Sequence, residues 1–183
     1  MTSKPNVILA GFMGAGKTST GKELAKQLNF DFFDIDHVIE AKNNMSVFEI
    51  FRRHGESYFR NEERAEIVNI RSSEKTVIST GGGLWLNPDN RGILLELGWC
   101  VWLKVSGEQA WKRIHPHLSQ RPLLAQSKDP QGDMAKIIQE RNPLYSLCHF
   151  SVQTDGKTPK EVAVEILSAL KEVRPFDLSL LQK

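Results

Sequence analysis

The stretch of sequence from Gly11 to Thr18 reads GFMGAGKT, and it decides the fold class of this chain. It matches the pattern G-x-x-x-x-G-K-[ST], in which the backbone N–H groups of a glycine-rich loop wrap around phosphate groups. An apolar run, Val7–Ala10, precedes the loop, and a segment with the apolar spacing of a helix, Lys17–Leu28, follows it. Because the pattern requires this strand–loop–helix context, the sequence predicts a P-loop that binds a nucleoside triphosphate.

The residue types in this loop suit a triphosphate and its metal ion. The Lys17 side chain places a positive charge on the β- and γ-phosphates, and the Thr18 hydroxyl is a ligand for one Mg²⁺ ion. Without nucleotide we expect the Lys17 ammonium to face solvent. The predicted nucleotide-binding residues in the loop are Gly14, Ala15, Gly16, Lys17, Thr18 and Ser19.

Apolar runs alternate with helical patterns along the rest of the chain. The first, third and fourth of these runs are rich in Val, Ile and Leu and lack polar alternation, which is typical of strands buried on both faces of a parallel sheet. Capping signals at Ser46–Glu49, Pro88 and Thr158–Glu161 predict helix starts between them. The alternation predicts an α/β fold with three layers. The predicted strands are Val7–Ala10, Phe30–Phe33, Thr76–Thr80, Cys100–Val105 and Phe150–Thr154.

Length and composition exclude several classes of protein. With 183 residues the chain is expected to form one domain, residues 1–183. Its 24 Lys and Arg against 22 Asp and Glu exclude a general nucleic-acid binder, and the four-residue run Val7–Ala10 is too short for a membrane span or signal peptide. Cys100 and Cys148 have no metal-ligand spacing, which favours a reducing compartment. We therefore expect a cytoplasmic protein without a membrane or nucleic-acid partner, and a monomer, because no exposed apolar repeat suggests an interface.

One segment does not fit this alternation. His115–Gly132 is polar, contains three prolines and has no regular period. It is long for a plain connection, so it is either a functional lid or a disordered loop.

The P-loop alone does not name the acceptor of the phosphoryl group. The chain lacks the guanine signature N-K-x-D of a GTPase and the Asp-Glu that ends the Walker-B strand of a motor ATPase. It has five other short motifs instead, and with the P-loop their order and spacing resemble the shikimate kinase family over about residues 5–172. These motifs are Asp34-Ile35-Asp36, Phe59-Arg60-Asn61-Glu62-Glu63, Gly81-Gly82-Gly83, Arg121-Pro122-Leu123-Leu124 and Arg141-Asn142-Pro143-Leu144-Tyr145.

The resemblance implies a reaction and a more detailed fold. The reaction is phosphorylation of the 3-hydroxyl group of shikimate by ATP, a step toward chorismate and the aromatic amino acids. The fold is that of P-loop kinases, a five-stranded parallel sheet in the order 2-3-1-4-5 flanked by helices. A substrate-binding helical region is expected at about residues 34–64 and a mobile lid at about residues 114–132.

The resemblance also implies which residues bind shikimate. Arg60 and Arg141 match the positions that hold its carboxylate, and a guanidinium group binds a carboxylate bidentately. Gly82 matches a position whose backbone N–H reaches the substrate. Asp36 matches the position that binds the ring hydroxyls and accepts the proton of the attacking one. Glu63 is expected to hold Arg60 in place.

The remaining implied roles lie on the nucleotide side. Lys17, Mg²⁺ and Arg121 would neutralise charge on the transferred phosphoryl group, with Arg121 arriving when the lid closes. Asp34 matches the position that orients the waters of Mg²⁺, and Arg113 is expected to pack on the adenine ring.

Two alternatives remain open at this stage. A kinase of another small polyol acid, such as gluconate, would share the P-loop and the fold. A nucleotide-binding regulator without catalysis would keep the P-loop but lack an acceptor site, and the presence of Asp36, Arg60 and Arg141 argues against it.

Overall fold

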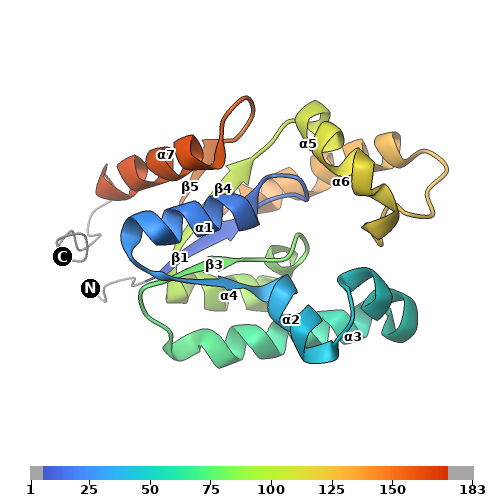
Figure 1. The fold of residues 1–183 in the computed structure, drawn as a ribbon, viewed down its shortest axis with the longest axis horizontal. Coiled ribbons are helices and arrows are strands. Elements are labelled where there is room, and N and C mark those ends of the chain that lie inside the picture. Colours follow the sequence, from blue (N-terminus) through green and yellow to red (C-terminus); the bar gives the residue numbers. More distant parts are fainter. Residues whose placement is uncertain (1–5, 173–183) are drawn as a thin grey trace.

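A parallel sheet of five strands forms the centre of the molecule in the computed structural model, which describes residues 6–172 (Figure 1). The spatial order β2-β3-β1-β4-β5 confirms the predicted fold class and strand order, and every neighbouring pair is parallel. All five predicted strands exist, with small shifts at their ends. They are β1 (Asn6–Ala10), β2 (Asp31–Asp34), β3 (Thr76–Ser79), β4 (Gly98–Lys104) and β5 (Phe150–Gln153).

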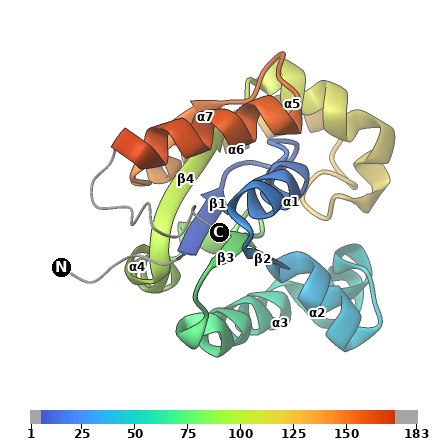
Figure 2. The ribbon, with the colours of Figure 1, turned by 60° about the vertical axis from the view of Figure 1, so that its left-hand side comes forward.

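Helices cover both faces of the sheet, which confirms the three layers. Figure 2 shows α1 and α7 on one side of the strands and α3 and α4 on the other. The α-helices are α1 (Lys17–Leu28), α2 (Ile35–Asn43), α3 (Val47–Asn69), α4 (Pro88–Leu97), α5 (Gly107–Ile114), α6 (Pro130–Tyr145) and α7 (Pro159–Glu172). Short 3₁₀ helices are η1 (Ile70–Ser72), η2 (Leu84–Leu86) and η3 (His115–Gln120).

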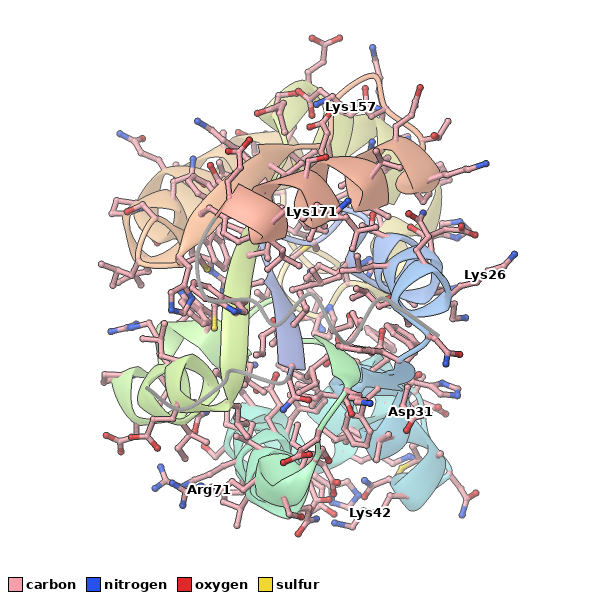
Figure 3. The ribbon with its side chains drawn as sticks, turned by 90° about the vertical axis from the view of Figure 1, so that its left-hand side faces the viewer. Lys26, Asp31, Lys42, Arg71, Lys157 and Lys171 are labelled. Carbon is pink, nitrogen blue, oxygen red and sulfur yellow. The ribbon has the colours of Figure 1, made fainter. Side chains whose placement is uncertain are left out.

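The apolar pattern of the central strands explains the layers. Every residue of β1 is buried, and so is β4 up to Leu103, because helices pack on both sides of them. Charged side chains lie around the outside, as Lys26 and Arg71 do in Figure 3.

None of the helices between residues 6 and 172 combines the length and the apolar composition needed to cross a membrane.

The predicted helix starts are confirmed. Ser46 and Glu49 form a capping box at the start of α3, and Thr158 and Glu161 exchange the same pair of bonds before α7. Pro88 is the first residue of α4. A feature that the sequence did not predict is the break of α3 at Gly55, whose φ of 82° lies in the left-handed region.

The segment predicted as a lid or a disordered loop contains regular structure. It begins with η3, and α6 starts inside it at Pro130, capped by the Asp129 side chain, which accepts a hydrogen bond from Gly132 N at 3.0 Å. The interpretation as a disordered loop is therefore wrong for this segment. The predicted domain extends over residues 1–183, of which residues 1–5 and 173–183 lie outside the described part.

Candidate active site

The loop between β1 and α1 has the backbone of an anion-binding site. Gly14 and Gly16 have φ values of 78° and 87°, which only glycine adopts without strain. Within the described residues, no side chain caps α1, and its first turn contains no acidic residue. The N–H groups at the start of α1 are therefore available to a negatively charged ligand.

The side chain of Lys17 reaches back to the start of this loop. Its Nζ donates hydrogen bonds to the carbonyl oxygens of Gly11 at 2.9 Å and Phe12 at 3.1 Å, so the expectation that it faces solvent is wrong. Burial lowers the pKa of Lys17 to about 8, although the nearby carboxylates of Asp36 and Asp34 oppose this shift. The ammonium is thus held in position before any nucleotide arrives.

Thr18 and Asp34 form a set of oxygen atoms that suits Mg²⁺. Thr18 Oγ1 donates to Asp34 Oδ2 at 2.7 Å. The other oxygen of Asp34 accepts a longer bond, 3.3 Å, from the backbone N of His37 and so caps α2. Hydroxyl and carboxylate oxygens are the hard ligands that Mg²⁺ prefers, so the residues present fit the predicted ion. One aspartate thereby serves both the helix cap and the predicted metal site.

Asp36 lies in the first turn of α2 and lines the same cavity as Lys17. Burial, and then the charge of Asp34, raise the pKa of Asp36 to about 6, while Lys17 opposes the rise. Among the described residues, its buried Oδ1 has no hydrogen-bond partner. A carboxyl group with a pKa near neutral is suited to accept a proton from a substrate.

Arg60 lies on α3 beyond the break at Gly55 and is held from two sides. Its Nη1 donates to Glu63 at 2.7 Å and its Nη2 to Glu56 at 2.7 Å. Glu63 was predicted as a partner and Glu56 was not, although the i,i+4 spacing on one helix is a signal for it. Because of the break, the rings of Phe51 and Phe59 come together at 5.0 Å, and the guanidinium group lies within 6 Å of both rings.

The triple glycine between β3 and η2 lies between the two arginines. A Cβ atom at Gly83 would come within 2.6 Å of the Arg60 guanidinium group, so a side chain at this position would push that group aside. Arg141, on α6, donates from Nη1 to the carbonyl oxygen of Gly82 at 3.1 Å. Residues far apart in the chain therefore meet at this loop.

One cavity of about 540 Å³ brings nearly all the predicted residues together. Arg121 already lines it, so the expectation that Arg121 reaches the site only on lid closure is not met in this structure. Ala15 lines a smaller adjoining cavity instead, with Thr154. The predicted residues that line the cavity of about 540 Å³ are Gly14, Gly16, Lys17, Thr18, Ser19, Asp36, Arg60, Gly82, Arg121 and Arg141.

Arg113 has a role that the sequence did not indicate. Its guanidinium group donates to the carbonyl oxygen of Gly14 at 2.8 Å and to that of Thr154 at 3.0 Å. It therefore ties the P-loop to the loop after β5. Arg113 lines both cavities, and its packing on adenine stays a prediction.

The fold and this site define a P-loop kinase of a small molecule, because a P-loop, a buried carboxyl group and two arginines share one cavity at the carboxyl ends of parallel strands. The family model of shikimate kinase matches residues 13–171, and the chain belongs to this family. It is 42% identical over 166 residues to the shikimate kinase of Sulfurihydrogenibium sp., covering 91% of this chain and 98% of that one.

Solved structures agree with this assignment. The shikimate kinase of Acinetobacter baumannii in complex with shikimate matches with a TM-score of 0.88 and 33% identity, over 93% of this chain and 94% of that one. A gluconokinase from Sinorhizobium meliloti matches with a TM-score of 0.59 and 17% identity, over 94% and 95%. At that identity the second match shows a common fold only.

Proposed function

We propose that this chain transfers the γ-phosphoryl group of ATP to the 3-hydroxyl group of shikimate, a step toward chorismate and the aromatic amino acids. The observation that carries this proposal is the single cavity in which the P-loop, Asp36 and the two arginines, Arg60 and Arg141, face one another. The P-loop accounts for the nucleotide, and paired guanidinium groups account for an acceptor with a carboxylate. The match to a relative solved with shikimate supports the same acceptor.

In this proposal Arg60 and Arg141 bind the carboxylate of shikimate. Arg60 keeps its bond to Glu63, whose side chain is fully buried, and exchanges the half-exposed Glu56 for the substrate. Arg141 keeps one N–H on the Gly82 carbonyl and offers the others. The backbone N–H of Gly82 reaches the substrate because no side chain intervenes.

Asp36 then accepts the proton of the attacking hydroxyl. The 3-oxygen of shikimate forms a bond to the γ-phosphorus as its O–H bond breaks, and the proton passes to the carboxylate of Asp36. The bond from the γ-phosphorus to the bridging oxygen breaks, and its electron pair leaves with ADP. The raised pKa of Asp36, about 6, leaves it ionised and basic at neutral pH.

Positive charge stabilises the transferred phosphoryl group. Lys17 from the P-loop and Arg121 from the lid lie on the same cavity and would contact its oxygens. Thr18, with Asp34 bonded to its hydroxyl, would hold one Mg²⁺ ion. When bound, the ion neutralises charge on the phosphates of ATP.

We also propose how the chain is divided in action. Residues 34–64 form the acceptor-binding region and residues 114–132 form a lid that excludes water from the phosphoryl group. The single domain acts on small molecules as a cytoplasmic monomer, without nucleic-acid or membrane partners. Its nearly balanced charge, 24 basic against 22 acidic residues, supports the absence of a nucleic-acid partner.

A coupled ADP-release assay with shikimate, gluconate, AMP and CMP as parallel acceptors tests this function. We expect ADP release with shikimate alone, a shikimate 3-phosphate product by NMR, and loss of activity on chelation that Mg²⁺ restores. Faster turnover with another acceptor would replace shikimate in the proposal. Nucleotide binding without turnover of any acceptor would instead favour a regulator.

A further inference from the structure

Tyr145, the last residue of α6, is completely buried and lies outside the cavity lining. Its hydroxyl donates a hydrogen bond of 2.6 Å to the carbonyl oxygen of Gly82. The same oxygen accepts the bond from Arg141 Nη1. Two donors from one helix thus converge on one carbonyl of the triple glycine.

The Tyr145 ring is itself held rigidly. It stacks on Trp102 of β4 with ring centroids 6.1 Å apart. The residue before it, Leu144, accepts a 2.8 Å bond from the Trp85 indole. Burial also raises the pKa of Tyr145 to about 12, so the hydroxyl keeps its proton and remains a donor.

Glycine needs such support more than any other residue. Three successive glycines have no side chains to restrict φ and ψ, so their peptide planes rotate easily unless other groups hold them. A hydrogen bond to the Gly82 carbonyl fixes the peptide plane on the carboxyl side of Gly82. This bond restricts the Gly82 backbone to fewer conformations, and so helps to keep the Gly82 N–H facing the cavity.

We propose that Tyr145 is a positioning residue for the acceptor substrate, which holds the Gly82 peptide and, through the shared carbonyl, the Arg141 guanidinium group. This inference rests on the proposed function for the identity of the acceptor, shikimate. Tyr145 does not contact the substrate. Loss of the Tyr145 hydroxyl should weaken binding of the acceptor and leave binding of the nucleotide unchanged.

The chain offers a matched control, because Tyr58 is its only other tyrosine. The Tyr58 hydroxyl also donates a hydrogen bond, at 2.8 Å, but to Asn43 Oδ1 on the surface. Tyr145→Phe and Tyr58→Phe each remove one hydroxyl and keep the ring. For Tyr145→Phe we expect the KM for shikimate to rise about 2- to 12-fold, the range of one net hydrogen bond, with kcat and the KM for ATP near wild type. Tyr58 belongs to the stretch 34–64 but does not line the cavity, so Tyr58→Phe should change none of the three.

A second measurement needs no substrate. Backbone amide hydrogen exchange of Gly81–Leu84 should be faster in Tyr145→Phe than in wild type, at a temperature where both are folded, and unchanged in Tyr58→Phe. Unchanged exchange together with an unchanged KM would overturn the proposal, as would equal losses for both substrates. If wild type did not phosphorylate shikimate, the proposed function would fail, while the exchange experiment would still decide whether Tyr145 holds the loop.

Discussion

The buried carboxyl groups of Asp36 and Glu63 meet on one side of Gly81. A Cβ atom at Gly81 would lie 2.5 Å from Asp36 Oδ1 and would also collide with Glu63 Oε1. Neither oxygen has a hydrogen-bond partner among the described residues. Burial raises the pKa of Asp36 to about 6 and that of Glu63 to about 7, and the charge of Asp36 adds to the rise at Glu63. Glu63 therefore links the predicted base, Asp36, to Arg60, which we propose binds the carboxylate of the acceptor.

The first prediction concerns the pH dependence of activity. Asp36 accepts a proton only when ionised, so kcat/KM for shikimate should fall as the pH drops through about 6. Glu63 has a pKa of about 7 and is mostly neutral where Asp36 titrates, so Glu63→Gln should leave this acidic limb near its wild-type position. A pH–rate profile of both proteins measures the position of the limb. A limb that moved to lower pH in Glu63→Gln would mean that Glu63 is charged while Asp36 titrates.

The second prediction concerns Gly81 itself. Gly81→Ala places a methyl group against both carboxyl groups, so we expect kcat to fall at least about 10-fold as Asp36 is displaced. Gly92→Ala is the matched control, because a Cβ at Gly92 meets nothing within 4 Å and the residue lies in α4. The control should retain activity and gain about 0.5–1 kcal/mol of stability. Full activity of Gly81→Ala would show that the carboxyl groups can move aside without effect.

The third prediction separates the effect of Asp36 on catalysis from its effect on the stability of the fold. Asp36→Asn should lower kcat about 10²–10⁴-fold, because the amide cannot accept the proton. The folded pKa of Asp36 is raised from 3.8 to about 6, so ionisation destabilises the fold progressively as the pH rises through this window. At neutral pH the neutral amide should therefore raise the free energy of unfolding by about 1–2 kcal/mol. Denaturant unfolding at pH 7 and below 4 checks the sign, since the difference should shrink at the lower pH.

The sequence predicted those parts of the molecule that depend on local patterns. The P-loop, the five strands and the capping box at Ser46 each follow from neighbouring residues, and all are confirmed. The break at Gly55 was missed because an isolated glycine inside a helical pattern does not reveal its φ. The strand order came from the resemblance alone.

Specific contacts between side chains from distant segments could not be predicted from local patterns in the sequence. Asp36 and Glu63 come from different helices, α2 and α3, and their carboxyl groups meet beside Gly81, which follows β3. Arg113 reaches the P-loop across 99 residues of chain, and no periodicity indicates that contact. Outside the P-loop, the predicted site residues came from the resemblance to the shikimate kinase family, whose motifs specify the residue types at these positions.

The fourth prediction concerns Lys17. Lys17→Ala should lower kcat by at least about 10²–10³-fold, because a preorganised charge at the phosphates is lost. The free energy of unfolding should change little, since burial already disfavours the charged ammonium, as its lowered pKa of about 8 indicates. Steady-state kinetics and thermal unfolding of the same preparation test both parts. Near-normal turnover in a folded variant would remove Lys17 from the mechanism.

The last prediction concerns the two arginines at the triple glycine. Arg60→Lys and Arg141→Lys keep the positive charge but lose the planar guanidinium group, since an ammonium group cannot make two parallel hydrogen bonds to a carboxylate. A charge-assisted hydrogen bond contributes about 1.5–3 kcal/mol, so kcat/KM for shikimate should fall about 10- to 150-fold at each site. The KM for ATP should stay near wild type.

Arg121→Lys is the contrasting variant in the same experiment. Arg121 belongs to the proposed lid and lines the cavity, and its expected partner is the transferred phosphoryl group. Its replacement should therefore lower kcat more than it raises the KM for shikimate. Steady-state kinetics with each substrate varied in turn separates the three variants. If Arg60→Lys and Arg141→Lys raised only the KM for ATP, these arginines would bind the nucleotide. The proposal that they bind the carboxylate of shikimate would then be wrong, and it is the main reason in the site's geometry for choosing shikimate as the acceptor.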